Sequence, residues 1–252
     1  TIKEAVQCYE TLASQGKKVF YYAGGSEIIS MARAGSIQPD SVIDLKAIAD
    51  CQVLEPSKDQ LVIGSAVSLT KIANSKLLPL LGTTVGRIAD HTNQCRITLG
   101  GNLCGTIIYR ETSLPLLLTD SYLLLFGPEG PRQAAFKDVF QQRLMLKPGE
   151  MVVQVHIPKE YLNVPYLHIK KTKSEKIDYP LLTVAGLKYQ NKIRLAISGL
   201  CPFPFRALSL EAAFNEGKIP DQDQLLCLLP APPLYDLRGS AAYFWRRGGG
   251  GP

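Results

Sequence analysis

The segment Tyr22-Ala23-Gly24-Gly25-Ser26-Glu27 decides how the first part of this chain folds, because its glycine pair ends an apolar run. Glycine tolerates positive φ angles and lets another group approach the backbone closely. Successive N–H groups at such a turn can point in one direction and bind an anion, most effectively where a helix begins. The segment therefore predicts a strand, an anion-binding turn and a helix in succession.

A second glycine pair stands in Ile97-Thr98-Leu99-Gly100-Gly101-Asn102. We expect it to form another turn of the same kind. Two such turns in one chain indicate a ligand that carries more than one phosphate, or a phosphate and a ring. The alternative is that both glycine pairs are ordinary tight turns that bind nothing.

The pattern on either side of these glycines predicts a chain of mixed helices and strands. Apolar residues fall on one face of 2–15, Thr1 and Glu4 have the spacing of a capping box, and Gly16 can end that helix. We expect further helices at 26–34, 68–73, 77–89, 114–119, 208–215 and 221–228. We expect strands at 18–22, 41–45, 61–63, 123–126 and 151–157, and a hairpin of 182–189 and 192–198 that turns at Gln190-Asn191.

The composition is that of an ordinary folded protein, with 46% hydrophobic and 20% charged residues. The net charge of +6 is spread along the chain, and no interleaving of aromatic and basic residues favours nucleic-acid binding. The densest basic cluster is Lys170, Lys171, Lys173 and Lys176. It either grips phosphate or forms a solvated basic edge, and the second interpretation is the commoner case.

Cysteine and histidine offer little material for a metal centre. None of the six cysteines forms a C-x-x-C pair, and the three histidines are scattered, so we expect no metal site. No apolar run is long enough to span a bilayer, and the N-terminus lacks the charged-then-apolar pattern of a signal peptide. We therefore expect a cytoplasmic protein that does not enter a membrane.

Taken in order along the chain, these motifs resemble those of a known family, the FAD-binding or medium subunits of the molybdenum hydroxylases. This family includes the xanthine dehydrogenase and carbon monoxide dehydrogenase types. The family's A-G-G-[ST]-[DE]-[IL] is matched at 23–28, and its T-[IL]-G-G-N-[IL] at 98–103. Further matches follow at 39–45, 148–151, 155–158, 171–179, 204–207 and 236–241. One glycine pair would be weak evidence, whereas unrelated chains rarely meet all these spacings in order.

The resemblance implies an α+β fold. Two subdomains of the PCMH/VAO-like type, residues 1–53 and 54–160, would clasp the flavin. A C-terminal α+β domain with an antiparallel sheet would cover 161–247, and 248–252 would form a flexible tail, since four glycines and a proline compose it.

The resemblance also implies a function, that of an oxidoreductase subunit with FAD as its cofactor. Electrons would come from a molybdopterin-binding large subunit through a [2Fe-2S] small subunit, and would leave to NAD or another acceptor. No side chain of this chain needs a catalytic role, because the flavin carries the redox chemistry. The alternatives are a stand-alone flavin-dependent oxidoreductase, or a non-enzymatic scaffold subunit whose flavin site has decayed.

The candidate cofactor-binding residues follow from the same motifs. They are Tyr22, Ala23, Gly24, Gly25, Ser26, Glu27, Ile28, Ile97, Thr98, Leu99, Gly100, Gly101, Asn102, Glu111, Leu146, Lys171 and Tyr179. The N–H groups of the first turn and the Ser26 hydroxyl would bind the pyrophosphate. Thr98 to Asn102 would form a second wall near the isoalloxazine.

Several of these residues have a second interpretation. Glu27 contacts the flavin or merely caps the helix that begins beside it. Asn102 belongs to the second wall or is an αL turn residue. Tyr179 lies against the isoalloxazine or is a core residue of a strand, and Lys171 neutralises flavin or phosphate charge or is a surface lysine. Relatives place an Asp where this chain has Glu111 as its nearest acid.

Overall fold

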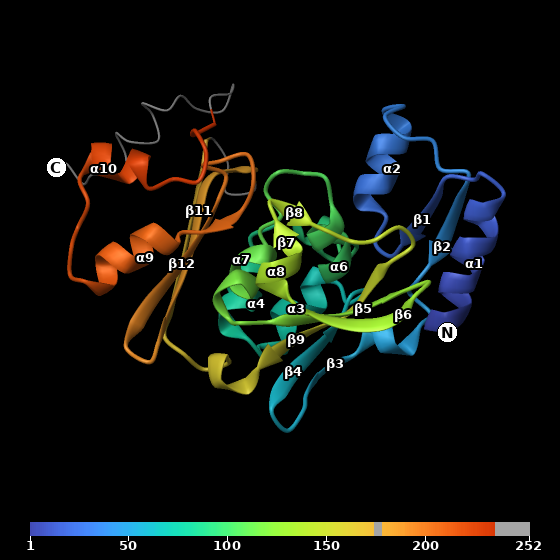
Figure 1. Cartoon of the computed structure of the whole chain (residues 1–252), viewed down its shortest axis with the longest axis horizontal. Coiled ribbons are helices and arrows are strands. Elements are labelled where there is room, and N and C mark those ends of the chain that lie inside the picture. Colours follow the sequence, from blue (N-terminus) through green and yellow to red (C-terminus); the bar gives the residue numbers. More distant parts are fainter. Residues whose placement is uncertain (174–177, 235–252) are drawn as a thin grey trace.

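The first part of the chain is a small α/β unit built around two parallel strands (Figure 1). The structure is a computed structural model, and it describes residues 1–173 and 178–234. The unit comprises α1 (Ile2–Ser14), β1 (Val19–Tyr22), α2 (Ser26–Arg33) and β2 (Ser41–Asp44). Thr1 and Glu4 form the expected capping box, and Gly16 and Gly35 follow their helices with positive φ.

The pairing of β1 with β2 fixes where a ligand can approach this unit. The register runs from Val19 opposite Ser41 to Tyr22 opposite Asp44, so the carboxyl ends of both strands lie at one edge. Ligands of open α/β sheets bind at that edge. The first glycine turn therefore stands at the ligand-binding edge, next to the residues that follow Asp44.

The middle of the chain is a five-stranded antiparallel sheet covered by helices. The strand order is β3-β4-β9-β5-β6. The elements are η1 (Ala49–Gln52), β3 (Leu54–Pro56), β4 (Gln60–Gly64), α3 (Leu69–Ser75), α4 (Pro79–Val85), α5 (His91–Gln94), α6 (Leu99–Cys104), α7 (Ser113–Leu118), β5 (Tyr122–Gly127), β6 (Gly130–Ala135), α8 (Phe136–Val139), the short pair β7 (Phe140–Gln141) and β8 (Arg143–Leu144), and β9 (Met151–Pro158).

This sheet is buried on both faces, and the alternation of β5 shows how. Leu123 and Leu125 belong to the main core beneath the helices, whereas Leu124 and Phe126 pack against the core of the first unit. Side chains of a strand alternate between the two faces of a sheet, so one strand can serve both cores. The result is three layers: helices, sheet and first unit.

The last part of the chain is a four-stranded antiparallel sheet with two helices against one face. The strand order is β10-β11-β12-β13. Its elements are η2 (Lys159–Tyr161), β10 (Tyr166–Thr172), β11 (Pro180–Tyr189), β12 (Lys192–Ser198), β13 (Phe205–Arg206), α9 (Leu208–Asn215) and α10 (Gln222–Cys227). Ala185 and Ala196 join the main core, while Ile197 faces the core beneath α9. Gln190 and Asn191 both have positive φ, as the predicted hairpin turn requires.

Two expectations about the middle unit are wrong. The helix expected at 77–89 is shorter, Pro79–Val85. The second glycine pair is not a tight turn: Gly100 and Gly101 lie inside α6, and neither has a positive φ. The Thr98 hydroxyl accepts a hydrogen bond from the Gly101 N–H at 3.2 Å, so this segment is the capped start of a helix.

The middle and C-terminal units are joined by a polar cluster around Asp120. The Asp120 carboxylate accepts hydrogen bonds from Tyr161 and, at 2.9 Å, from Arg194 of β12. The Arg194 guanidinium also lies over the rings of Tyr161 and Tyr189. Burial opposes ionisation of Asp120, but the hydrogen bonds from Tyr161 and Arg194 outweigh it and lower the pKa of Asp120.

We expect Asp120→Asn to lower the free energy of unfolding by about 1 kcal/mol at pH 7, since a partly exposed ion pair is lost. Asn tolerates the positive φ of 46° at this position, so the backbone is preserved. Because the pKa of Asp120 is lower in the folded than in the unfolded chain, its ionised form stabilises the fold at pH values above the unfolded pKa of about 3.9. This stabilisation is lost as the pH falls through the folded pKa. Urea unfolding should therefore show a smaller difference at pH 3 than at pH 7. An equal difference at both values would contradict the ion-pair explanation.

Across residues 1–173 and 178–234, no helix has the length and apolar character needed to cross a membrane.

Candidate functional site

The first glycine turn connects the end of β1 to the start of α2. Gly25 has φ 70° and occupies the N-cap position of α2, where no side chain caps the helix. The first N–H groups of a helix have no acceptor within it. A Cβ on Gly25 would collide with the ring of Tyr22, so this position admits only glycine. The turn is thus an uncapped helix start in which glycine lets the Tyr22 ring lie directly against the backbone.

Ser26 adds a second feature to this turn. Its hydroxyl oxygen is buried and has no hydrogen-bond partner among the described residues. Buried polar groups nearly always have a partner, so an unpaired one calls for an explanation. A hydroxyl beside free N–H groups at the positive end of a helix is suited to an anionic ligand.

The structure brings the two glycine motifs together. A Cβ on Gly24 would collide with the carbonyl oxygen of Arg96 and would lie 3.3 Å from the Cα of Ile97. Glycine at position 24 therefore lets the first turn pack directly on the backbone that leads into α6. The two motifs are therefore adjacent in space, and that both line one cofactor site stays a prediction.

The residues of the second motif are held in place by core packing and by hydrogen bonds. Leu99 is fully buried in the main core, and the Gly100 N–H donates to the Ser65 carbonyl oxygen at 2.8 Å. The Asn102 side-chain oxygen accepts a hydrogen bond from the Thr112 hydroxyl at 2.6 Å. The interpretation of Asn102 as an αL turn residue is wrong, because it lies within the helix.

Glu27 ties the first motif to the loop that follows α6. Its carboxylate accepts hydrogen bonds from the Thr106 hydroxyl and, at 2.7 Å, from the Thr106 N–H. A Cβ on Gly105 would collide with the same carboxylate. The interpretation of Glu27 as a helix cap is wrong, since no side chain caps α2. A direct contact of Glu27 with the flavin stays a prediction.

Glu111 lies in a buried ion pair between the middle and C-terminal units. One carboxylate oxygen is 2.9 Å from the Lys170 ammonium, and the other accepts a hydrogen bond from Thr183 at 2.7 Å. The Glu111 and Lys170 side chains are 4% and 5% exposed. Burial raises the pKa of Glu111, and the opposing effects of Lys170 and Thr183 do not cancel the shift. Lys170 is therefore no part of a solvated basic edge, and contact of Glu111 with the flavin stays a prediction.

The remaining candidates lie farther along the chain. Tyr179 is 55% exposed and stacks on Tyr109, with ring centroids 5.0 Å apart, so it is not a core residue. Lys171 is exposed on β10, and Leu146 packs against the main core. Ile28 is half-buried. No hydrogen bond or ring contact within 1–173 and 178–234 links Leu146 or Lys171 to either glycine motif, and their flavin roles stay predictions.

Lys46 lies beside the first glycine turn, although the sequence motifs did not indicate it. Its ammonium lies 3.3 Å from the Ala23 carbonyl oxygen and 4.7 Å from the centroid of the Tyr22 ring. Its position just after β2 could have indicated Lys46, because the carboxyl ends of neighbouring parallel strands meet at one edge of the sheet. That the two strands are neighbours follows only from the tertiary structure.

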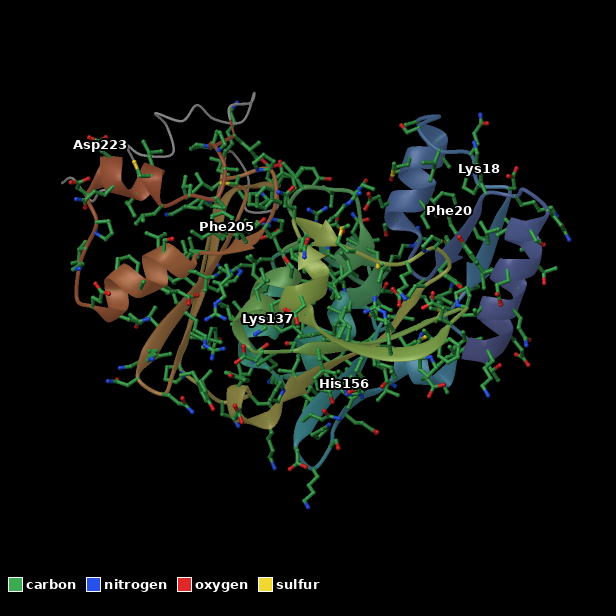
Figure 2. The ribbon with its side chains drawn as sticks, in the orientation of Figure 1. Lys18, Phe20, Lys137, His156, Phe205 and Asp223 are labelled. Atoms are coloured by element: carbon green, nitrogen blue, oxygen red, sulfur yellow. The ribbon has the colours of Figure 1, made fainter. Side chains whose placement is uncertain are left out.

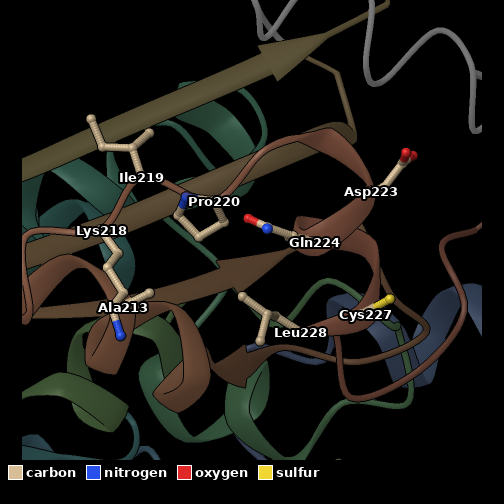
Figure 3. Close-up of a pocket in the computed structure, with 8 residues that line it drawn as sticks. All are labelled: Ala213, Lys218, Ile219, Pro220, Asp223, Gln224, Cys227 and Leu228. Carbon is tan, nitrogen blue, oxygen red and sulfur yellow. The ribbon is translucent and has the colours of Figure 1, made fainter.

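A hollow of about 680 Å³ lies elsewhere, between α9 and α10 (Figure 3). Its lining consists of Ala213, Lys218, Ile219, Pro220, Asp223, Gln224, Cys227 and Leu228. These helices stand at the opposite end of the long axis from α2 and β1 (Figure 1). The hollow is therefore remote from the glycine motifs.

The glycine-lined helix start, the unpaired hydroxyl and the adjoining second motif define the site of a protein that binds a phosphate-bearing cofactor. Residues 1–160 match the family described as the FAD binding domain in molybdopterin dehydrogenase. This chain belongs to that family, and FAD is its cofactor. The resemblance to molybdenum hydroxylase medium subunits is confirmed.

Similarity to known proteins extends over nearly the whole chain. The carbon monoxide dehydrogenase medium chain of Hydrogenophaga pseudoflava is 24% identical, and the match covers 96% of this chain and 88% of that one. Caffeine dehydrogenase subunit beta of Pseudomonas sp. (strain CBB1) is 23% identical over 78% of this chain and 71% of that one.

Two solved structures share the fold. Carbon monoxide dehydrogenase from Hydrogenophaga pseudoflava, in a form lacking the Mo-pyranopterin moiety, has a TM-score of 0.83 at 23% identity, over 96% of this chain and 88% of that one. Quinoline 2-oxidoreductase from Pseudomonas putida 86 has a TM-score of 0.80 at 19% identity, over 95% of this chain and 87% of that one. The expected α+β fold is confirmed, while the domain boundaries stay a prediction.

The residues of the first turn fit the pyrophosphate of FAD. The N–H groups at the start of α2 and the Ser26 hydroxyl would hold the phosphates, and Gly24 and Gly25 allow the close packing and the positive φ that shape this turn. FAD, when bound, supplies the hydride- and electron-transfer chemistry of the subunit. The contribution of the chain is to bind and orient the cofactor.

Proposed function

We propose that this chain is the electron-transfer subunit of a molybdenum hydroxylase complex. Electrons reach it from a [2Fe-2S] small subunit, which takes them from a molybdopterin-binding large subunit, and leave to NAD or another acceptor. The observation that carries this proposal is the similarity to a medium chain over 96% of this chain and 88% of that relative. A cytoplasmic location for the complex is part of the same proposal.

The role of the residues in this function is confined to the cofactor. The first turn and the segment before α6 close on one another through Gly24, so they would hold the two ends of a dinucleotide in a fixed relation. Glu27 and its Thr106 contacts would keep the loop after α6 against that turn. Substrate oxidation would take place in the large subunit, whose pocket determines the reducing substrate.

Purification from the native host should recover molybdenum and iron with this chain. The expected result is a complex whose flavin, extracted with acid, is FAD, and which oxidises a substrate of the large subunit. The isolated chain should show only weak diaphorase-like activity, and none with purines or aldehydes. Size-exclusion chromatography with metal analysis provides the measurement.

Two outcomes would replace this proposal with another. A chain that elutes alone and turns over an organic substrate at ordinary enzyme rates would be a stand-alone flavin-dependent oxidoreductase. A chain that travels with the metals but stays colourless after incubation with FAD would be a scaffold subunit.

A further inference from the structure

We propose that Lys46 is the cation that pairs with the FAD pyrophosphate at the first glycine turn. The inference rests on the FAD-binding role described above and assigns it a residue outside both glycine motifs. Lys46 lies two positions past the end of β2, and therefore at the same edge as the turn that follows β1.

The contacts of Lys46 direct its charge to that turn. Its ammonium donates to the Ala23 carbonyl oxygen at 3.3 Å, immediately before the glycine pair. It also lies over the face of the Tyr22 ring, and the same ring fills the space where a Cβ of Gly25 would stand. The ammonium and Gly25 therefore both adjoin the Tyr22 ring. Cation–π contact holds such a charge in place without neutralising it.

The electrostatics favour a change of partner when phosphate arrives. Lys46 pairs with Asp44 at 2.8 Å, but the two side chains are 49% and 55% exposed. An exposed pair contributes little stability, so exchange of the carboxylate for a phosphate costs little. A pyrophosphate would also find Asp44 nearby, and Lys46 is placed to offset the repulsion between them.

Two other charged groups near the turn, Glu27 and Arg110, are held by hydrogen bonds to described residues. The Glu27 carboxylate is occupied by Thr106. The Arg110 guanidinium donates to the carbonyl oxygens of Gly105 and Gln142. Among the described residues, the charged partner of Lys46 is a weak surface pair with Asp44, so its charge is able to respond to the ligand.

Titration of this chain with FAD and with riboflavin tests the assignment, with flavin fluorescence as the readout. Lys46→Gln should weaken FAD binding by about tenfold at low salt, the effect of losing one charge-assisted contact. Lys46→Arg should restore most of the affinity. Asp44→Asn should tighten FAD binding by a few-fold, because it removes the competing negative charge. Riboflavin, which carries no phosphate, should bind the wild type and all three variants alike.

A matched control comes from the amino end of β1, the neighbour of β2. Lys18 is exposed and precedes β1, at the amino end away from the turn (Figure 2). Lys18→Gln changes the net charge by the same amount and should leave FAD affinity unchanged. Thermal melting without flavin should be the same for all variants, since only surface contacts are altered.

The dependence of FAD affinity on salt concentration provides a second readout, because a Lys46 that served only in packing would not affect it. Wild-type FAD affinity should fall as ionic strength rises, and the fall should be smaller in Lys46→Gln. The assignment would be overturned if Lys46→Gln bound FAD as tightly as the wild type does, or if it lost as much affinity for riboflavin as for FAD. Because the chain is measured alone, either result is independent of whether it assembles with molybdenum and iron–sulfur subunits.

Discussion

Gly25→Val should reduce FAD affinity by about a hundredfold or more, since several charge-assisted hydrogen bonds from the turn would be lost together. Gly25 has φ 70°, which a β-branched residue strongly disfavours. The added side chain would also displace the Tyr22 ring. Both effects move the N–H groups that face the pyrophosphate. Flavin titration with parallel thermal melting measures the two consequences separately.

Gly35 provides the matched control for this substitution. It follows the other end of α2 with φ 72°, and a Cβ there meets no atom within 4 Å. Gly35→Val therefore carries a similar backbone cost without the collision and without altering the cofactor turn. We expect both variants to lose stability, and only Gly25→Val to lose FAD. Equal FAD affinity in the two variants would show that the first turn is structural.

Local features of the fold could be predicted from the sequence because local interactions determine them. The capping box of α1 needs only Thr1 and Glu4, and both contacts form. The hairpin turn at Gln190 and Asn191 needs two residues that tolerate positive φ. The helix α9 covers the expected 208–215, and Gly217 follows it with positive φ.

The strands that escaped prediction owe their structure to neighbours distant in sequence. Strand β6 has the sequence Gly-Pro-Arg-Gln-Ala-Ala, which has weak β propensity, and it forms because β5 offers it an edge. Strand β10 contains basic residues beside apolar ones, and the Lys170 side chain is buried against Glu111. Such pairings are tertiary and leave no local signal.

The site shows the same division between local and distant determinants. The glycine pair and Ser26 could be identified from their positions after a strand. The second pair was mistaken for a turn, because the sequence does not reveal that Thr98 caps a helix containing both glycines. Lys46 was missed because its proximity to Ala23 depends on the parallel pairing of β1 with β2.

Glu111→Ala should produce the largest loss of stability, about 3–5 kcal/mol, because it leaves a buried charge without its partner. The Lys170 ammonium is 5% exposed, and its remaining contact is the Arg87 carbonyl oxygen at 2.7 Å. Urea unfolding gives the free energy directly. Glu129→Ala serves as the control, since the Glu129–Lys147 pair is exposed and its loss should cost less than about 1 kcal/mol.

The double variant Glu111→Met/Lys170→Met distinguishes the buried charge from other losses at this position. Replacing both partners of a buried ion pair by apolar residues is often neutral or stabilising, so most of the lost free energy should return. A double variant as unstable as Glu111→Ala would show that Thr183 and packing, not the ion pair, dominate the stability at this position.

FAD titration of the double variant, once its stability is restored, then tests the remaining prediction for Glu111. If the carboxylate also contacts the cofactor, FAD should bind more weakly by about 1–3 kcal/mol although stability is recovered. Wild-type affinity would place Glu111 outside the flavin site, as a residue that joins the middle unit to the C-terminal sheet.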